Sequence, residues 1–139
     1  MKHLLSLFLC ASLALCVVAQ DRSLPSRRAF QPAPVLLTMT GTQDAAGMAQ
    51  TPMGYVVPLY AAPIPAQSRV SLYGRSLLSV SSVLLWHDGG IVAIPAQSAR
   101  NSFPGLETVA FRLPAGVVGE VWVTTIGRQS SNTVRLTVE

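Results

Sequence analysis

A strict alternation of apolar and polar side chains near the C-terminus is the feature that most constrains the fold. In Thr108–Leu113 every second residue is a large apolar one, namely Val109, Phe111 and Leu113. Thr133–Val138 repeats the pattern with Val134, Leu136 and Val138. Successive side chains of a β-strand point to opposite faces, so a period of two collects all the apolar groups on one side. Both segments are therefore predicted to be strands with one buried and one wet face.

A third strand is predicted between these two, over Glu120–Ile126. This segment is rich in Val, Thr and Trp, which fit a pleated surface. Pro114-Ala115-Gly116 and Gly127-Arg128 supply the breaks on either side. Phe103–Glu139 is therefore predicted to form a meander of three antiparallel strands.

Short apolar runs earlier in the chain predict five more strands: Val35–Thr40, Gly54–Tyr60, Arg69–Tyr73, Val80–Trp86 and Ile91–Ile94. Gly41–Pro52 reads as a polar loop. Because proline cannot donate a ladder hydrogen bond, Pro58 indicates that its strand lies at a sheet edge or is bent. His87–Gly90 has the composition of a tight turn. About eight short strands at roughly 12-residue spacing, without a helical period, predict an all-β antiparallel sandwich.

The N-terminus predicts export. A short basic start is followed by an apolar run of about 15 residues, from Leu4 to Val18. Because a helix needs ~20 residues to span a bilayer, residues 1–19 are read as a signal peptide cleaved after Ala19 rather than as a membrane anchor. The expected location is secreted, periplasmic or at the cell surface, with no stable membrane insertion after cleavage.

Both cysteines of the chain, Cys10 and Cys16, lie inside this leader. Each follows a leucine rather than a small residue, so lipidation is not expected. The remaining chain has no thiol, and its roughly 100 ordered residues must be held by one hydrophobic core. Residues 20–34 hold three Arg and three Pro and read as a linker. The expected organisation is therefore a signal peptide (1–19), a linker (20–34) and one β-sandwich domain (35–139).

The chain carries few charged residues, and they are dispersed along it. Beyond the leader there are nine Arg and no Lys against six acidic residues, a net charge of about +3. A nucleic-acid-binding protein concentrates its basic residues on one element. Here they are spread about one per strand or loop, so solvated strand faces are the simpler reading. No nucleic-acid partner is expected.

The five residues Ile-Pro-Ala-Gln-Ser occur twice, at Ile64–Ser68 and at Ile94–Ser98. The flanking residues differ between the copies, and one duplication is too few for a solenoid. The repeat is interpreted as a coincidence or as a reused connector.

Several motifs resemble a known family: Phe103-Pro104-Gly105-Leu106-Glu107, Phe111-Arg112-Leu113-Pro114, Ser131-Asn132-Thr133-Val134 and the earlier Leu72-Tyr73-Gly74. They are similar to the Solibacter-type uncharacterised C-terminal domain of secreted bacterial proteins, over most of the chain beyond the leader. More distantly, the chain is similar to the immunoglobulin-like domains of plexins and transcription factors.

This resemblance implies an immunoglobulin-like antiparallel β-sandwich. With the strand count and the leader read from the sequence, the expected fold is such a sandwich of about 7–8 strands, preceded by a cleaved signal helix. It implies a secreted or surface-exposed bacterial protein, and no activity, since none is established for the family. One departure is that Arg75-Ser76-Leu77 stands where the family usually carries a Gly-Thr-Gly run. That loop is therefore expected to differ.

No group of residues predicts catalysis. His87 is the one histidine beyond the leader, and its neighbour Asp88 lacks the third, spatially oriented member that a triad requires. Gly89-Gly90 explains the pair as a turn, so a metal site is not predicted either. The acidic residues show no spacing typical of a glycosidase pair. The protein is therefore not expected to be an enzyme, and no catalytic residue, metal ligand or cofactor is proposed.

The aromatic residues are the better lead. Trp122 alternates with Val121 and Val123, so it is exposed if those two are buried. An exposed Trp can mark an interaction site. Trp86 is more readily explained as a core residue. Two functions stay open: a non-catalytic module for protein–protein interaction, adhesion or assembly with an unknown envelope or extracellular protein, or a glycan-binding module that stacks sugars on exposed rings. The candidate contact residues are Trp122, Tyr73, Tyr55 and Tyr60.

Overall fold

Two antiparallel β-sheets make up the fold. The computed structural model describes residues 31–61 and 63–139, and within them there are ten strands and no helix. The predicted all-β antiparallel sandwich is confirmed, with more strands than the sequence indicates. The predicted signal peptide and the first part of the predicted linker lie outside the described residues. None of the described residues forms a helix long and apolar enough to span a bilayer.

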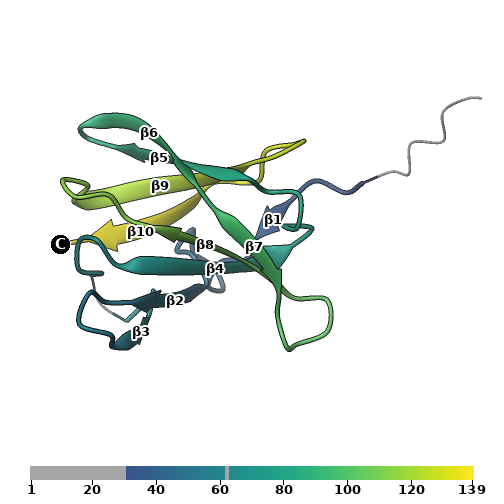
Figure 1. Ribbon diagram of the computed structural model, residues 1–139, viewed down its shortest axis with the longest axis horizontal. Coiled ribbons are helices and arrows are strands. Elements are labelled where there is room, and N and C mark those ends of the chain that lie inside the picture. The colour runs from purple at the N-terminus through teal and green to yellow at the C-terminus, as the bar shows by residue number, and fades with distance from the viewer. Residues whose placement is uncertain (1–30, 62) are drawn as a thin grey trace, which may run out of the picture. The chain divides into compact units, whose positions relative to one another are not determined.

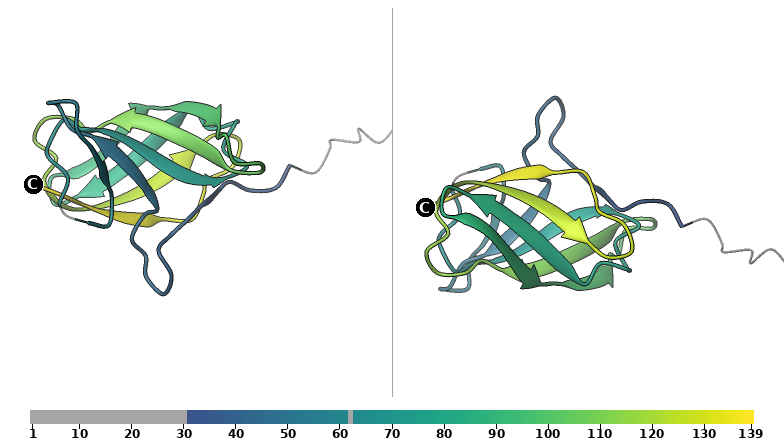
Figure 2. Two further views of the ribbon diagram at one scale, coloured as in Figure 1. Left: turned by 90° about the horizontal axis from the view of Figure 1, so that it is seen from below. Right: turned by 90° about the horizontal axis from the view of Figure 1, so that it is seen from above.

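The larger sheet has six strands, in the order β3-β2-β4-β8-β7, with β1 also paired to β4. These are β1 (Val35–Leu36), β2 (Gly47–Gln50), β3 (Val56–Pro58), β4 (Arg69–Arg75), β7 (Gln97–Arg100) and β8 (Glu107–Arg112). The smaller sheet has the order β10-β9-β5-β6. Its strands are β5 (Ser82–His87), β6 (Gly90–Pro95), β9 (Gly119–Ile126) and β10 (Val134–Val138). In Figure 1, β5 and β6 lie on one side of the molecule and β2 and β3 on the other, and Figure 2 gives two further views.

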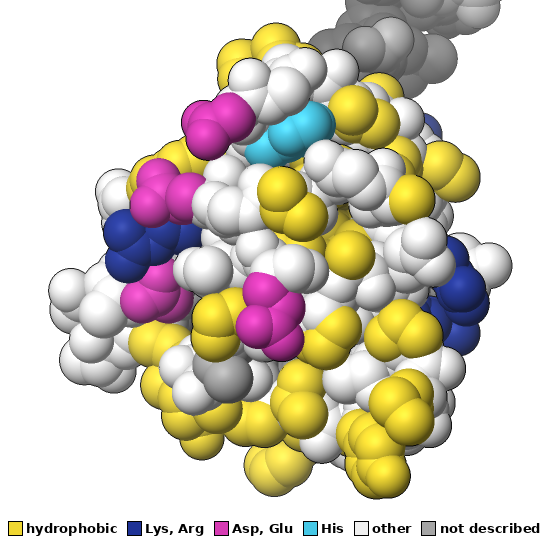
Figure 3. Space-filling view, turned by 90° about the vertical axis from the view of Figure 1, so that its left-hand side faces the viewer, with side chains coloured by type: hydrophobic (Ala, Val, Ile, Leu, Met, Phe, Trp, Pro, Cys, Tyr) yellow, Lys and Arg dark blue, Asp and Glu magenta, His cyan; other side chains and the backbone are white. Residues whose placement is uncertain are grey.

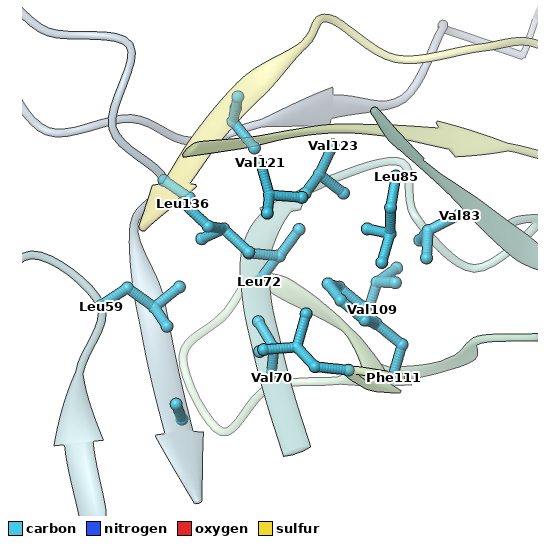
Figure 4. Close-up of a cluster of buried hydrophobic side chains, with 14 of the residues drawn as sticks. Leu59, Val70, Leu72, Val83, Leu85, Val109, Phe111, Val121, Val123 and Leu136 are labelled. Carbon is cyan, nitrogen blue, oxygen red and sulfur yellow. The ribbon is translucent and has the colours of Figure 1, made fainter. Parts of the chain in front are cut away.

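The alternating side chains meet between the two sheets. All six apolar residues of the two C-terminal patterns are at most 3% exposed: Val109, Phe111, Leu113, Val134, Leu136 and Val138. Figure 4 shows several of them facing Val70 and Leu72 of β4 and Val83 and Leu85 of β5 in the interior. Burying one such side chain contributes about 1.5–3 kcal/mol, so this layer is the main source of stability.

The three C-terminal strands do not form one meander. β9 and β10 pair with each other, but β8 pairs with β4 and β7 in the other sheet. The predicted meander is therefore wrong at its first connection, where residues 113–118 carry the chain from one sheet to the other. Alternation shows that one face of each strand is buried. It cannot show in which sheet a strand lies, because both sheets bury their inner face in the same way.

The sequence pattern does not predict β2 or β7. β2 lies within the predicted loop Gly41–Pro52 and begins at Gly47. A Cβ at Gly47 would collide with the carbonyl oxygen of Ser71 and would lie 2.9 Å from Leu59 Cδ1. Glycine is depleted in strands, yet here its missing side chain allows β2 to approach β4 closely.

Two predicted strands are shorter than expected. Of Val35–Thr40, only the first two residues form β1, and of Gly54–Tyr60 only three form β3. Pro58 lies in β3, which is an edge strand as predicted. After β1 only single contacts continue, namely a hydrogen bond from the Leu37 N–H to the Tyr73 carbonyl and a bridge between Thr38 and Ala45. Turns lie on both sides of β3.

β5 and β6 form the predicted hairpin. His87 lies opposite Gly90, so Asp88 and Gly89 make the turn. Gly90 has a φ of 118°, which a residue without Cβ adopts freely. β6 then leads, within two residues, into β7 of the other sheet, and Figure 1 shows this ribbon crossing the molecule diagonally.

Both copies of Ile-Pro-Ala-Gln-Ser contact the four-stranded sheet just before the chain enters a strand of the six-stranded one. Ile64 bridges β10 and the chain then enters β4, while Ile94 belongs to β6 and the chain then enters β7. The N–H of Ala66 donates to the carbonyl just after β10 at 3.1 Å. The N–H of Ala96 donates to the carbonyl just before β5 at 3.0 Å. Of the two interpretations above, the structure supports the reused connector.

The end of the predicted linker packs onto the sandwich. Pro34 is buried, and Arg128 Nη1 donates to Gln31 Oε1 at 3.2 Å. The side-chain amide of Asn132 binds both backbone groups of Leu36, accepting from its N–H at 2.8 Å and donating to its carbonyl at 3.0 Å. Asn132, part of the C-terminal motif, thus ties β1 to the connection between β9 and β10.

The outer edge of β10 is covered by earlier segments. The N–H of Arg135 donates to the carbonyl of Gln43 at 2.8 Å, and its own carbonyl accepts from Ala45 N–H at 3.0 Å. Ile64 pairs in a similar way farther along β10. Among the described residues, β6 is therefore the uncovered edge of the four-stranded sheet.

Truncation of the core is expected to destabilise the protein strongly. Phe111 is 3% exposed, so Phe111→Ala should lower the free energy of unfolding by about 3–5 kcal/mol. Its neighbour Arg112 is exposed on the opposite face, and Arg112→Ala should change it by less than about 0.5 kcal/mol. Thermal unfolding of both variants checks this pair, and equal losses would show the face assignment to be wrong.

Removal of one buried hydroxyl is expected to stabilise the protein. Thr125 is fully buried, and its Oγ1 has no hydrogen-bond partner among the described residues. An unpaired buried polar group costs about 1–3 kcal/mol, so Thr125→Val is expected to raise the free energy of unfolding by about 1 kcal/mol. The matched control is Thr124→Val, because the Thr124 hydroxyl has a partner in Thr133 at 2.9 Å. A melting temperature lowered by Thr125→Val would contradict the assignment.

Candidate binding surface on the four-stranded sheet

The outer face of the four-stranded sheet carries both tryptophans of the described chain. In β9, Val121 and Val123 are fully buried, so Trp122 between them points outward. Trp122 lies directly opposite Trp86 of β5 on one side and Arg135 of β10 on the other. These side chains therefore form a row across the middle of the sheet.

The row continues onto the edge strand. Trp86 lies opposite Ile91 of β6, and the next outward pair is Leu84 with Ala93. Trp86 is 44% exposed and Ile91 57%. We name the apolar outward residues of this face the Trp86 surface: Leu84, Trp86, Ile91, Ala93, Pro95 and Trp122.

Charged side chains contact Trp122 at the β10 end of this row. The indole N–H of Trp122 donates to Glu120 Oε1 at 2.9 Å, and the Arg135 guanidinium lies over the indole ring, 5.9 Å from its centroid. Arg135 Nε donates to Asp44 Oδ1 at 2.8 Å, and its Nη1 lies 3.9 Å from Glu120 Oε2. The hydrogen bond from Arg135 to Asp44, and then the charge of Asp44, raise the pKa of Arg135 above its ordinary value.

This charged group forms a rim beside the apolar surface. Asp44 reaches Arg135 because residues 43–45 pair with the edge of β10. Figure 3 views the molecule from one end, and on its left a dark-blue basic group lies between two magenta acidic ones. Exposed ion pairs contribute little to stability, typically about 0–1 kcal/mol. Their structural effect here is to fix the position of Trp122.

The four residues predicted as contacts are not brought together. Trp122 is only half-buried and lies in the network above, whereas Tyr73 lies on the outer face of the other sheet, opposite Thr108. Tyr55 and Tyr60 are 67% and 64% exposed and flank β3. Val121 and Val123 are buried, so the condition set for Trp122 holds and its side chain points outward, but the fold does not provide a shared platform with the tyrosines.

Trp86 is not the core residue that its sequence context favours. Val83 and Leu85 are fully buried, so the alternation of β5 directs Trp86 outward. The run from Val83 to Trp86 is apolar at every position, because its outward residues Leu84 and Trp86 are apolar as well as its inward ones. An unbroken apolar run carries no alternation from which the inner face could be read.

The other chemistry-bearing groups do not form a site, although His87 Nε2 is buried without a hydrogen-bond partner among the described residues. His87 Nδ1 accepts from the N–H of Gly89 at 3.1 Å, which ties the ring into the hairpin turn. The Glu107 carboxylate accepts from the N–H of Leu77. Among the described residues, no group of three or more His, Asp or Glu could hold a metal ion. The Trp86 surface is therefore the leading candidate site in this part of the chain.

The two tryptophans are expected to differ in accessibility. Trp122→Phe leaves Trp86 as the reporter, and Trp86→Phe leaves Trp122. Because Trp86 is more exposed and Trp122 lies beneath Arg135, acrylamide should quench Trp86 fluorescence with the steeper concentration dependence. Adding Arg135→Gln to Trp86→Phe should increase the quenching of Trp122. Equal quenching of both single-tryptophan proteins would contradict the geometry of this face.

Comparison with known families and curated proteins identifies no relative. No family model matches the chain, and no curated protein matches it. The resemblance of Phe103–Leu136 to the Solibacter-type domain therefore stays a prediction from the sequence.

Proposed function

We propose that the protein is a secreted or surface-exposed, non-catalytic immunoglobulin-like module that binds another protein through the Trp86 surface. The observation that carries this proposal is the direct pairing of Trp86, 44% exposed, with Ile91, 57% exposed, on an outward sheet face. The leader and the family resemblance are the support for export to the envelope or beyond it.

Exposed apolar side chains of this size favour contact with a partner. Each Å² of apolar surface removed from water contributes about 25 cal/mol, and Trp is among the residues that dominate measured binding energies at interfaces. The five further residues of the Trp86 surface surround Trp86 in the same sheet face. A sheet face of this kind suits a partner that presents apolar side chains to its centre.

The charged rim adds the second element of a protein interface. Arg135, Asp44 and Glu120 lie at one end of the tryptophan row. Interfaces commonly combine an apolar centre with a polar, solvent-accessible rim. Charges in such a rim set orientation and association rate more than affinity.

Glycan binding through exposed aromatics is the alternative. A sugar stacks on a free ring face, whereas Trp122 has its indole N–H bonded to Glu120 and Arg135 over its ring. Stacking on Trp122 would displace the guanidinium. The tyrosines lie elsewhere in the fold, so Trp86 would have to supply the ring for this alternative.

A crosslinking experiment tests the proposal. A photoreactive amino acid at position 91, beside Trp86, should trap a protein of the envelope fraction, whereas the same group at Val56 should not. Val56 is the matched control because it is equally exposed, at 61%, but lies on β3 of the other sheet. Trp86→Ala should weaken binding of the purified partner at least tenfold, equivalent to about 1.4 kcal/mol, with an unchanged melting temperature.

Polysaccharide titrations separate the two functions. Saturable quenching of Trp86 fluorescence by a polysaccharide, lost in Trp86→Ala, would favour the glycan alternative over a protein partner. Identical crosslinked products from positions 91 and 56 would contradict the proposed surface.

A further inference from the structure

The outer face of the six-stranded sheet brings two arginines into direct register. Arg69 of β4 lies opposite Arg112 of β8. Their neighbours Val70 and Phe111 are buried in the core, so both guanidinium groups point outward, and both residues are exposed. Side chains in such a cross-strand pair have their Cβ atoms about 5 Å apart.

This arginine pair carries uncompensated charge. Like charges directly opposite one another in a sheet are destabilising. Both ion pairs found among the described residues involve Arg135 on the other sheet. Among these residues, therefore, neither Arg69 nor Arg112 has a carboxylate partner. A pair that costs stability and has no internal partner is suited to an external anion.

The whole face has one sign of charge. Arg75 lies on the same side of β4 as Arg69, six residues along, a distance of about 20 Å at ~3.3 Å per residue. The described residues include six Arg and five acidic residues, a net charge of +1, yet this face holds three of the arginines. The five acidic residues lie elsewhere. Asp44 and Glu120 contact Arg135, and Asp88 lies in the hairpin turn. Glu107 accepts from the Leu77 N–H, and Glu139 follows β10.

Groups that bind hydroxyls lie between the charges. Gln50 of β2 is the other cross-strand neighbour of Arg69, and Ser71 lies between Arg69 and Tyr73 on the outward side of β4. Tyr73 is half-buried and lies opposite Thr108. The face thus offers amide, hydroxyl and aromatic groups along the strand that connects the positive charges.

We propose that this face binds an acidic polysaccharide, with Arg69 and Arg112 together gripping one carboxylate or sulfate group. The planar guanidinium donates two parallel hydrogen bonds to such groups, and two of them in register can hold one oxyanion from both sides. A polymer along β4 would place a second acidic group near Arg75 and its hydroxyls at the side chains between.

Other acidic polymers fit the face less well. Nucleic-acid binding rests on neutralising many backbone phosphates with clustered basic residues, whereas this face supplies three arginines. Protein interfaces commonly have an apolar centre, and in this molecule the Trp86 surface on the opposite sheet supplies one. The site is therefore separate from the Trp86 surface, and each can fail without the other.

The test is calorimetric titration of the whole exported protein with polygalacturonate, heparin and neutral dextran at low salt. The two acidic polymers should bind and dextran should not. Arg69→Gln and Arg112→Gln should each weaken binding at least tenfold, and the double variant should abolish it. Melting temperatures of these variants should be unchanged or higher, because the repulsion between the two arginines is removed.

The matched control is Arg100→Gln, which makes the same charge change at an exposed arginine of β7. Arg100 lies opposite Glu107, on the side of its strand facing away from this surface, so this variant should bind within about twofold of the parent. An equal loss with Arg100→Gln would overturn the proposal in favour of non-specific attraction. Binding of polyglutamate as tight as that of polygalacturonate, lost in the same variants, would overturn the polysaccharide class, and absence of binding to either acidic polymer would overturn the site.

Discussion

Burial of one face of each long strand against the opposite sheet is the interaction on which the rest of the structure depends. The described part of the chain contains no cysteine, so no disulfide supports it. β4 and β8 of one sheet and β5 and β9 of the other meet through Val, Leu and Phe side chains that are almost completely buried. Since the net stability of a domain is about 5–15 kcal/mol, the loss of one large group from this layer removes a substantial fraction of it. The inner faces are therefore constrained to be apolar, whereas the outer faces are free to differ, and here one is aromatic and the other cationic.

The crossings between sheets determine which side chains become neighbours on those outer faces. The chain changes sheet between β4 and β5, after β6 and between β8 and β9. As a result Trp86 lies beside Trp122, and Arg69 lies beside Arg112, although each pair is far apart in the sequence. The two copies of Ile-Pro-Ala-Gln-Ser contribute to this arrangement, since each brings a proline and a small residue to the point where the chain stops pairing with the four-stranded sheet. Surface chemistry in this protein is thus a consequence of connection geometry.

Much of the interior could be predicted from the sequence, because side-chain alternation reports burial directly. Val109, Phe111, Val134 and Leu136 lie where their two-residue spacing places them, and the turn at His87–Gly90 follows from its composition. Trp86 could not be placed, since its strand is apolar on both faces. The arginines look dispersed along the chain because register between distant strands is not visible in linear spacing. β2 escapes detection for a related reason: Gly47 weakens the local strand signal while meeting a requirement set by Ser71 in another strand.

The covered edge of β10 has a consequence for assembly. Backbone groups at an open sheet edge can accept a strand from another molecule. In the four-stranded sheet, residues 43–45 and Ile64 occupy that position on β10, and β6 presents the opposite edge. Among the described residues, growth of this sheet by strand addition can therefore proceed in one direction only. Two copies joined through β6 would be related by a two-fold axis, and each would end at its own β10. An assembly through this sheet would close as a pair instead of extending into a fibre.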